Sequence, residues 1–174
     1  MNVKSKVCFY DKEKSEYCED CTKIEISTLF CFDGFNDQCV NAILFDLDST
    51  VMASKSGIFE SWILEMFDKL SENFCVAILS NNKRIEYIEK AKHQCNIDVV
   101  GHANKPNPRV LLNYLTSKNI EPQNAVMVGD RPLTDILAGK LAGTKTILVD
   151  SITRETEPKL TRFVRFLERL TIRK

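Results

Sequence analysis

The stretch AILFDLDST, residues 42–50, decides the fold, because an unbroken apolar run leads directly into two aspartates one residue apart. Four consecutive apolar residues predict a strand that is covered on both faces, as in a parallel sheet. Ligands of such sheets bind beyond the carboxyl ends of the strands. We therefore expect Asp46 and Asp48 to lie at the ligand-binding edge of a parallel sheet.

Similar apolar runs recur along the chain and predict five strands, at residues 42–45, 75–79, 97–100, 125–128 and 146–149. The segments between them repeat apolar residues at three- and four-residue steps, which is the helical period. These predicted apolar faces include Ile58, Trp62 and Phe67, then Ile85, Ile88 and Ala91, and later Leu133 and Leu141. Alternating strands and helices predict an α/β fold, a doubly wound, Rossmann-like parallel sheet flanked by helices.

Length and charge limit the class of protein. The 174 residues suit a single domain, and we divide them into a Cys-rich extension (1–40) that packs on a core domain (41–174). The 24 basic and 24 acidic residues cancel, so no nucleic-acid partner is expected. An apolar run long enough to span a bilayer is missing, and the start is too charged for a signal peptide, so we expect a cytoplasmic protein.

The first 40 residues contain a CxxC pair, Cys18 and Cys21, which is half of a zinc site or a redox pair. Cys8 and Cys31 could complete a four-cysteine metal site. Acidic neighbours of the pair disfavour a reactive thiolate. Ordinary packed thiols are therefore favoured, and metal binding stays open.

Polar residues also follow the other predicted strands. Ser80 and Asn81 come after the second strand, Lys105 after the third, and Asp130 and Asp135 after the fourth. Clustered carboxylates repel one another unless a cation joins them, and Mg²⁺ accepts carboxylates while keeping sites for substrate phosphate. Ser80 and Lys105 could hold phosphoryl oxygens, whereas Asn81 could contact substrate or cap the next helix. The set indicates phosphoryl transfer through an aspartyl-phosphate.

These motifs resemble the haloacid dehalogenase (HAD) superfamily of phosphohydrolases over roughly residues 40–150. All four of its motifs stand in order, each at a predicted strand end. They are DxDx[TV] at Asp46, Asp48 and Thr50, the serine at Ser80, the lysine at Lys105, and GDxxxxD at Gly129, Asp130 and Asp135.

The resemblance implies a role for each residue. Asp46 would be the nucleophile, and Asp48 the acid that protonates the leaving group and then activates water. Ser80 and Lys105 would hold the phosphoryl oxygens. Asp46, the backbone carbonyl of Asp48, and Asp130 would bind Mg²⁺, and Asp135 would support this shell.

The spacing of the motifs leaves no room for a cap domain, since Thr50 and Ser80 are 30 residues apart and Ser80 and Lys105 are 25 apart. An open site favours a substrate whose bulk stays outside, such as a lipid head group, a protein or a nucleic-acid end. Alternatively, a second subunit of an oligomer could cover the site.

Within the cap-less group (subclass IIIA), the chain is similar to the YqeG-type branch, which includes phosphatidylglycerophosphate phosphatases. LSNN (79–82), GDRPLTDILAGKLAGTKTILV (129–149) and TRFVRFLERL (161–170) carry this likeness, while Ser49 and Arg131 replace an expected Asn and Gln. A predicted basic helix at 158–172 could touch an anionic membrane, which would make the protein peripheral to it. Packing on the sheet is the favoured interpretation of that helix. A non-catalytic binding module on the same fold is a further alternative.

Overall fold

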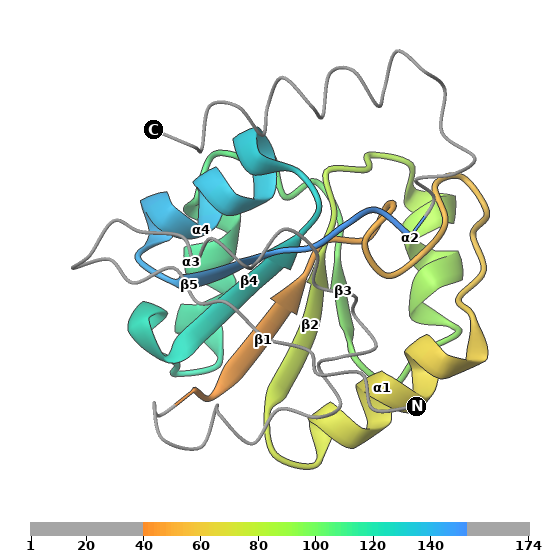
Figure 1. Cartoon of the computed structure of the whole chain (residues 1–174), viewed down its shortest axis with the longest axis horizontal. Coiled ribbons are helices and arrows are strands. Elements are labelled where there is room, and N and C mark those ends of the chain that lie inside the picture. The colour runs from red at the N-terminus through yellow and green to blue at the C-terminus, as the bar shows by residue number, and fades with distance from the viewer. Residues whose placement is uncertain (1–39, 153–174) are drawn as a thin grey trace.

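Five parallel strands form the sheet, and the computed structural model describes it within residues 40–152. The strands are β1 (Ala42–Phe45), β2 (Cys75–Leu79), β3 (Asp98–Val100), β4 (Ala125–Gly129) and β5 (Lys145–Leu148). Each lies within one residue of its predicted bounds, and Figure 1 shows their order, β3-β2-β1-β4-β5. The predicted α/β, Rossmann-like fold is confirmed.

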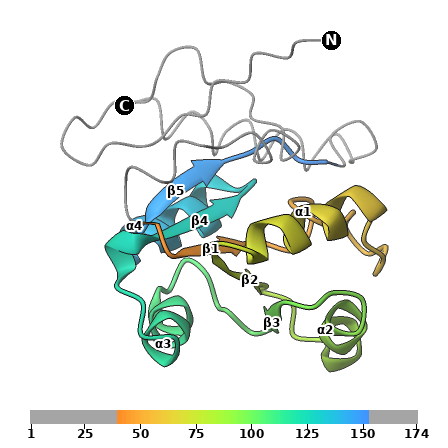
Figure 2. The same ribbon diagram turned by 90° about the horizontal axis from the view of Figure 1, so that it is seen from below.

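Helices cover both faces of this sheet (Figures 1 and 2). Helices α1 (Ser61–Ser71) and α2 (Ile85–Lys92) share one buried cluster with Ile43 and Phe45 of β1. Residues of α3 (Arg109–Ser117) and α4 (Leu137–Ala142) share the opposite cluster with Ala42 and Leu44. Successive side chains of a strand point to opposite faces, so β1 contributes to both clusters and lies at the centre of the core.

Two short helical turns complete the described elements, a 3₁₀ turn η3 (Pro122–Asn124) before β4 and a π-type turn η4 (Pro132–Ile136) after it. The predicted helix face around Leu133 is therefore divided between η4 and α4. The predictions for the Cys-rich extension, its possible metal site and the basic helix at 158–172 lie outside the described residues.

Four apolar residues assigned to covered helix faces are exposed instead, namely Ile58, Ile85, Leu133 and Leu141. Ile58 lies just before α1, Ile85 is the first residue of α2, and Leu133 lies in the turn before α4. Helical period predicts which side of a helix is apolar, but it does not show where the sheet beneath that helix ends. Trp62 is only partly buried, and its indole N–H donates to Glu60 (2.7 Å).

Successive strands are added to one side of β1 and then to the other, so the strand order reverses between β1 and β4. The chain runs from β1 outward through β2 to β3, then crosses back to β4 on the other side of β1. Backbone pairing continues to the strand ends, since the Asp46 N–H donates to the Val128 carbonyl (2.8 Å). The loops that follow β1 and β4 therefore meet at the switch point, where ligands of open α/β sheets bind.

Candidate active site

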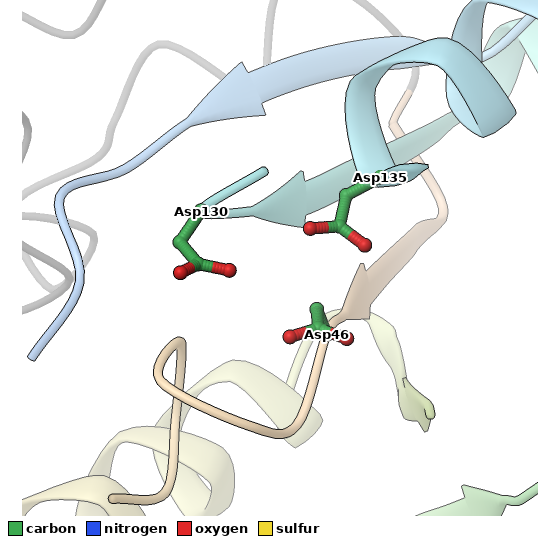
Figure 3. Close-up of side chains that lie close together, drawn as sticks. All are labelled: Asp46, Asp130 and Asp135. Carbon is green, nitrogen blue, oxygen red and sulfur yellow. The ribbon is translucent and has the colours of Figure 1, made fainter. Parts of the chain in front are cut away.

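Three buried carboxylates converge at this switch point. Asp46 follows β1, Asp130 follows β4, and Asp135 comes from η4; ligand oxygens of the three lie within 4.8 Å of one another. Figure 3 shows their side chains directed toward a common centre. The convergence predicted from the strand ends is thus present in the structure.

Lys105 lies against two of these carboxylates. Its Nζ is 2.5 Å from Asp46 Oδ1 and 2.7 Å from Asp135 Oδ1, and the lysine is buried. Burial alone would lower the pKa of Lys105, but the charges of Asp46 and Asp135 together raise it above its usual value. The ammonium is therefore retained inside the protein as the partner of these two acids.

One lysine does not neutralise both Asp46 and Asp135, the two carboxylates that it contacts. Burial, and then repulsion from Asp135, raises the pKa of Asp46 from its usual 3.8 to about 6, although Lys105 opposes this change. The electrostatic cost that raises this pKa is the cost a bound cation would relieve. The all-oxygen donor set with excess negative charge fits Mg²⁺.

The local backbone explains why Asp135 can approach the strand end. A Cβ at Gly129 would lie 2.3 Å from Cβ of Asp135, so only glycine leaves space there. The Arg131 N–H donates to Asp135 Oδ2 (3.0 Å), which fixes the carboxylate within its own turn. The spacing of the GDxxxxD motif thus follows from one close approach and one hydrogen bond.

Asn81 holds the backbone of Lys105 from both sides. Its side-chain Nδ2 donates to the Lys105 carbonyl (2.9 Å), and the Lys105 N–H donates to Asn81 Oδ1 (2.7 Å). The neighbouring Asn82, rather than Asn81, accepts from the Arg84 N–H (2.9 Å) at the start of α2. The Asn81 carboxamide therefore connects the loop after β2 with the loop after β3.

Two hydroxyl groups complete the cluster. Ser80 is buried, and its Oγ accepts from the Asn82 N–H (3.0 Å), which orients the hydroxyl at the end of β2. Thr50 Oγ1 lies 3.3 Å from Asp46 Oδ2 and 3.3 Å from Asp130 Oδ1, within donating distance of both. Thr50 belongs to the first motif, but the sequence alone indicates no role for it.

Asp48 lies apart from the three clustered side chains. It is partly buried, and its Oδ1 accepts from the hydroxyl of Tyr87 on α2 (2.7 Å). The sequence gives no signal for Tyr87, because this residue stands in a helix outside every motif. Only a contact between residues 39 positions apart reveals it.

Comparisons with known proteins agree with this geometry. A family model described as HAD-hydrolase-like matches residues 102–162. The chain is 28% identical over 138 residues to the "Probable phosphatase YqeG" of Bacillus subtilis, covering 79% of each chain. A shorter match is 36% identical over 55 residues to a phosphoserine phosphatase from Thermus thermophilus, and it covers 32% of this chain and 22% of the other.

Solved structures show the same fold. A HAD family enzyme from Bacteroides thetaiotaomicron, solved with magnesium and inorganic phosphate, matches with a TM-score of 0.52 at 12% sequence identity. That match covers 71% of this chain and 99% of the other.

The family model, the relative of matching length and the shared fold all show that this chain is similar to HAD hydrolases. Its similarity to a phosphatase of the YqeG type extends over most of the chain.

Proposed function

We propose that this protein is a Mg²⁺-dependent phosphomonoester hydrolase that works through an aspartyl-phosphate on Asp46. The observation that carries the proposal is the buried cluster of Asp46, Asp130 and Asp135 with Lys105 as its internal cation. An acidic cluster of this kind at a sheet switch point is costly to keep without a ligand. A non-catalytic binding module would have no need of it.

The residues divide the work of two displacements. Asp46 attacks the phosphorus while Asp48 gives a proton to the departing oxygen. In the second displacement Asp48 takes a proton from water, whose oxygen attacks the phosphorus and breaks its bond to Asp46, releasing inorganic phosphate. Ser80 and Lys105 hold the phosphoryl oxygens. Asn81 belongs to this phosphate site because its side chain makes two hydrogen bonds with the backbone of Lys105.

The carboxylates of Asp46 and Asp130, the backbone carbonyl of Asp48 and the support of Asp135 form the proposed metal site. When bound there, Mg²⁺ would neutralise phosphoryl charge and polarise the phosphorus–oxygen bonds.

Two features support a substrate whose bulk stays outside the site, and we propose a lipid phosphomonoester such as phosphatidylglycerophosphate. Both intervals where a cap could be inserted lie within the described residues, and they hold only α1 with β2 and α2 with β3. Segments that leave the carboxyl ends of β1, β2 and β4 expose Ile58, Ile85 and Leu133, with Ile85 73% exposed. Apolar side chains around a polar site suit an amphiphilic substrate.

Among the described residues, no helix is long and apolar enough to cross a membrane.

The mechanism is tested with the Asp46→Asn variant and a matched Asp98→Asn control at the start of the edge strand β3. We expect Asp46→Asn to lose at least about 10³-fold in phosphate release with Mg²⁺, as on removal of a covalent nucleophile. The control should keep its activity. Full activity of Asp46→Asn would exclude the aspartyl-phosphate.

The substrate is tested by measuring phosphate release from phosphatidylglycerophosphate in mixed micelles and from soluble and protein-bound phosphomonoesters, each with Mg²⁺ or EDTA. Preference for the lipid, together with flotation on anionic but not neutral vesicles, would support a cytoplasmic enzyme peripheral to a membrane. Preference for a soluble or macromolecular phosphate would overturn the lipid assignment while keeping the chemistry. No hydrolysis of any of them would favour the binding module.

A further inference from the structure

A tyrosine outside every motif contacts Asp48, the proposed acid and base. The Tyr87 hydroxyl donates to Asp48 Oδ1 at 2.7 Å. Burial, followed by the contact with Asp48, raises the pKa of Tyr87 well above its usual value. The phenol is therefore placed as the donor to one oxygen of Asp48.

The position of this phenol is fixed by its surroundings. The Tyr87 ring packs against the core cluster that α1 and α2 share. Gln94, just beyond α2, ties the loop after β1 to this helix: its Nε2 donates to the Gly57 carbonyl (2.9 Å), and its Oε1 accepts from the Phe59 N–H (3.1 Å). Helix α2 and the loop that carries Asp48 are thus joined at both Tyr87 and Gln94.

We propose that Tyr87 is a positioning residue for Asp48, holding one of its oxygens so that the other faces the reacting phosphoryl group. This inference rests on the proposed function. A carboxylate held by one short hydrogen bond loses freedom to turn away, and small misplacements of a catalytic group are costly. The bond joins α2 to the catalytic loop and fixes the side chain on which both displacements depend.

The second displacement depends on this bond more than the first. In it, the water oxygen bonds to phosphorus, the bond from phosphorus to Asp46 breaks, and Asp48 receives the proton of the water. Asp48 is ionised as this step begins, and a phenol bonds more strongly to a carboxylate than to a neutral carboxyl group. Loss of the phenol oxygen should therefore slow hydrolysis of the aspartyl-phosphate more than its formation.

The test compares Tyr87→Phe with Tyr114→Phe. Tyr114 offers a matched control, because its hydroxyl donates to Asp98 Oδ2 (2.9 Å) at the amino end of β3. Both variants remove a single oxygen from a tyrosine–aspartate hydrogen bond. The probe is p-nitrophenyl phosphate with Mg²⁺, whose good leaving group needs little help from an acid, so that the second displacement limits turnover.

We expect Tyr87→Phe to keep the initial burst of nitrophenol and to lower the steady rate about tenfold, within the roughly 10²–10⁴-fold that a positioned acid or base contributes. After the substrate is removed, phosphorylated Asp46 of Tyr87→Phe should decay about tenfold more slowly than that of the parent, as measured by acid quench, while the rate of the burst is unchanged. Tyr114→Phe should behave as the parent in both assays, and thermal unfolding of all three proteins reports any loss of folding.

Two results would overturn the inference. If the phosphorylated Asp46 of Tyr87→Phe decays as fast as that of Tyr114→Phe, and their steady rates are the same, Tyr87 has only a structural role, and the proposed function stands. If the parent forms no phosphoenzyme and releases no phosphate, the proposed function fails, and the inference fails with it.

Discussion

Two ion pairs in different parts of the sheet have the same length and very different surroundings. Lys105 and Asp135 are 2.7 Å apart at the carboxyl edge, with side chains only 2% exposed. Lys118 and Asp98 are also 2.7 Å apart, at the amino end of β3, with side chains 40% and 51% exposed. Distance alone would rank the two pairs as equal.

Burial and charge balance make the difference. Water screens the outer pair, so it resembles surface ion pairs that contribute little to stability. Lys105 is shut away from water with Asp46 as well as Asp135, and Asp130 adds a third carboxylate to the cluster. The inner group is poorly solvated and has excess negative charge, which suits it to bind a cation and a phosphoryl group.

The largest contrast is expected in activity. Lys105→Met should lower kcat/KM for p-nitrophenyl phosphate about 10²–10³-fold, because a preorganised cation stabilises the charge of the transition state. Lys118→Met removes the same charge from the outer pair and should change kcat/KM little. Equal losses in the two variants would break the comparison.

The same two variants should differ in stability without metal. Lys105→Met leaves buried carboxylates without their cation and should lower the free energy of unfolding by about 3 kcal/mol, the low end for breaking a buried pair. Asp46 can take up a proton, which limits the loss. Lys118→Met should have little effect. Urea unfolding in EDTA measures both, and an unchanged midpoint for Lys105→Met would contradict the prediction.

Metal binding at the cluster of Asp46, Asp130 and Asp135 should stabilise the folded protein, and the outer pair should play no part in this. At pH 7.5, Mg²⁺ at 100 times its dissociation constant should add about 2.7 kcal/mol to the free energy of unfolding. At pH 5 the gain should be smaller, because the pKa of Asp46 near 6 means that protons compete with the metal. Thermal unfolding with and without Mg²⁺ measures this gain. Asp130→Asn should abolish it and Asp98→Asn should retain it; the reverse pattern would place the metal elsewhere.

The smallest expected effect concerns pH. Asp46 and Asp98 should change the free energy of unfolding with pH in opposite directions. The pKa of folded Asp46 is raised, so folded protein binds more protons there, and metal-free stability should fall as pH rises from about 4 to about 6. Hydrogen bonding from Lys118 lowers the pKa of Asp98, so its contribution is present above pH 4 and lost as pH falls below it. Denaturant unfolding measures the free energy of unfolding against pH. Asp46→Asn should flatten its slope between about pH 4 and 6, and Asp98→Asn should flatten its slope below about pH 4. A rise in metal-free stability between pH 4 and 6 that Asp46→Asn removes would contradict the assigned sign.

Most of the sheet could be predicted from the sequence, because strands buried on both faces consist of short apolar runs. The polar residues that follow those runs also predicted the members of the inner cluster, since parallel strands bring their carboxyl ends to one edge. The exposure of Ile85 could not be predicted in this way, because helical period does not report where a neighbouring element stops.

By itself, the sequence determined the parallel sheet and the acidic groups at its edge, because each depends on residue types next to one another in the chain. Only the tertiary structure decided how those groups are balanced. It brought Lys105 against Asp46 and Asp135, set Asn81 on the backbone of Lys105, and placed Tyr87 on Asp48. These contacts join residues 24 or more positions apart, and folding brings them within hydrogen-bonding range through the packing of loops and α2 on the sheet.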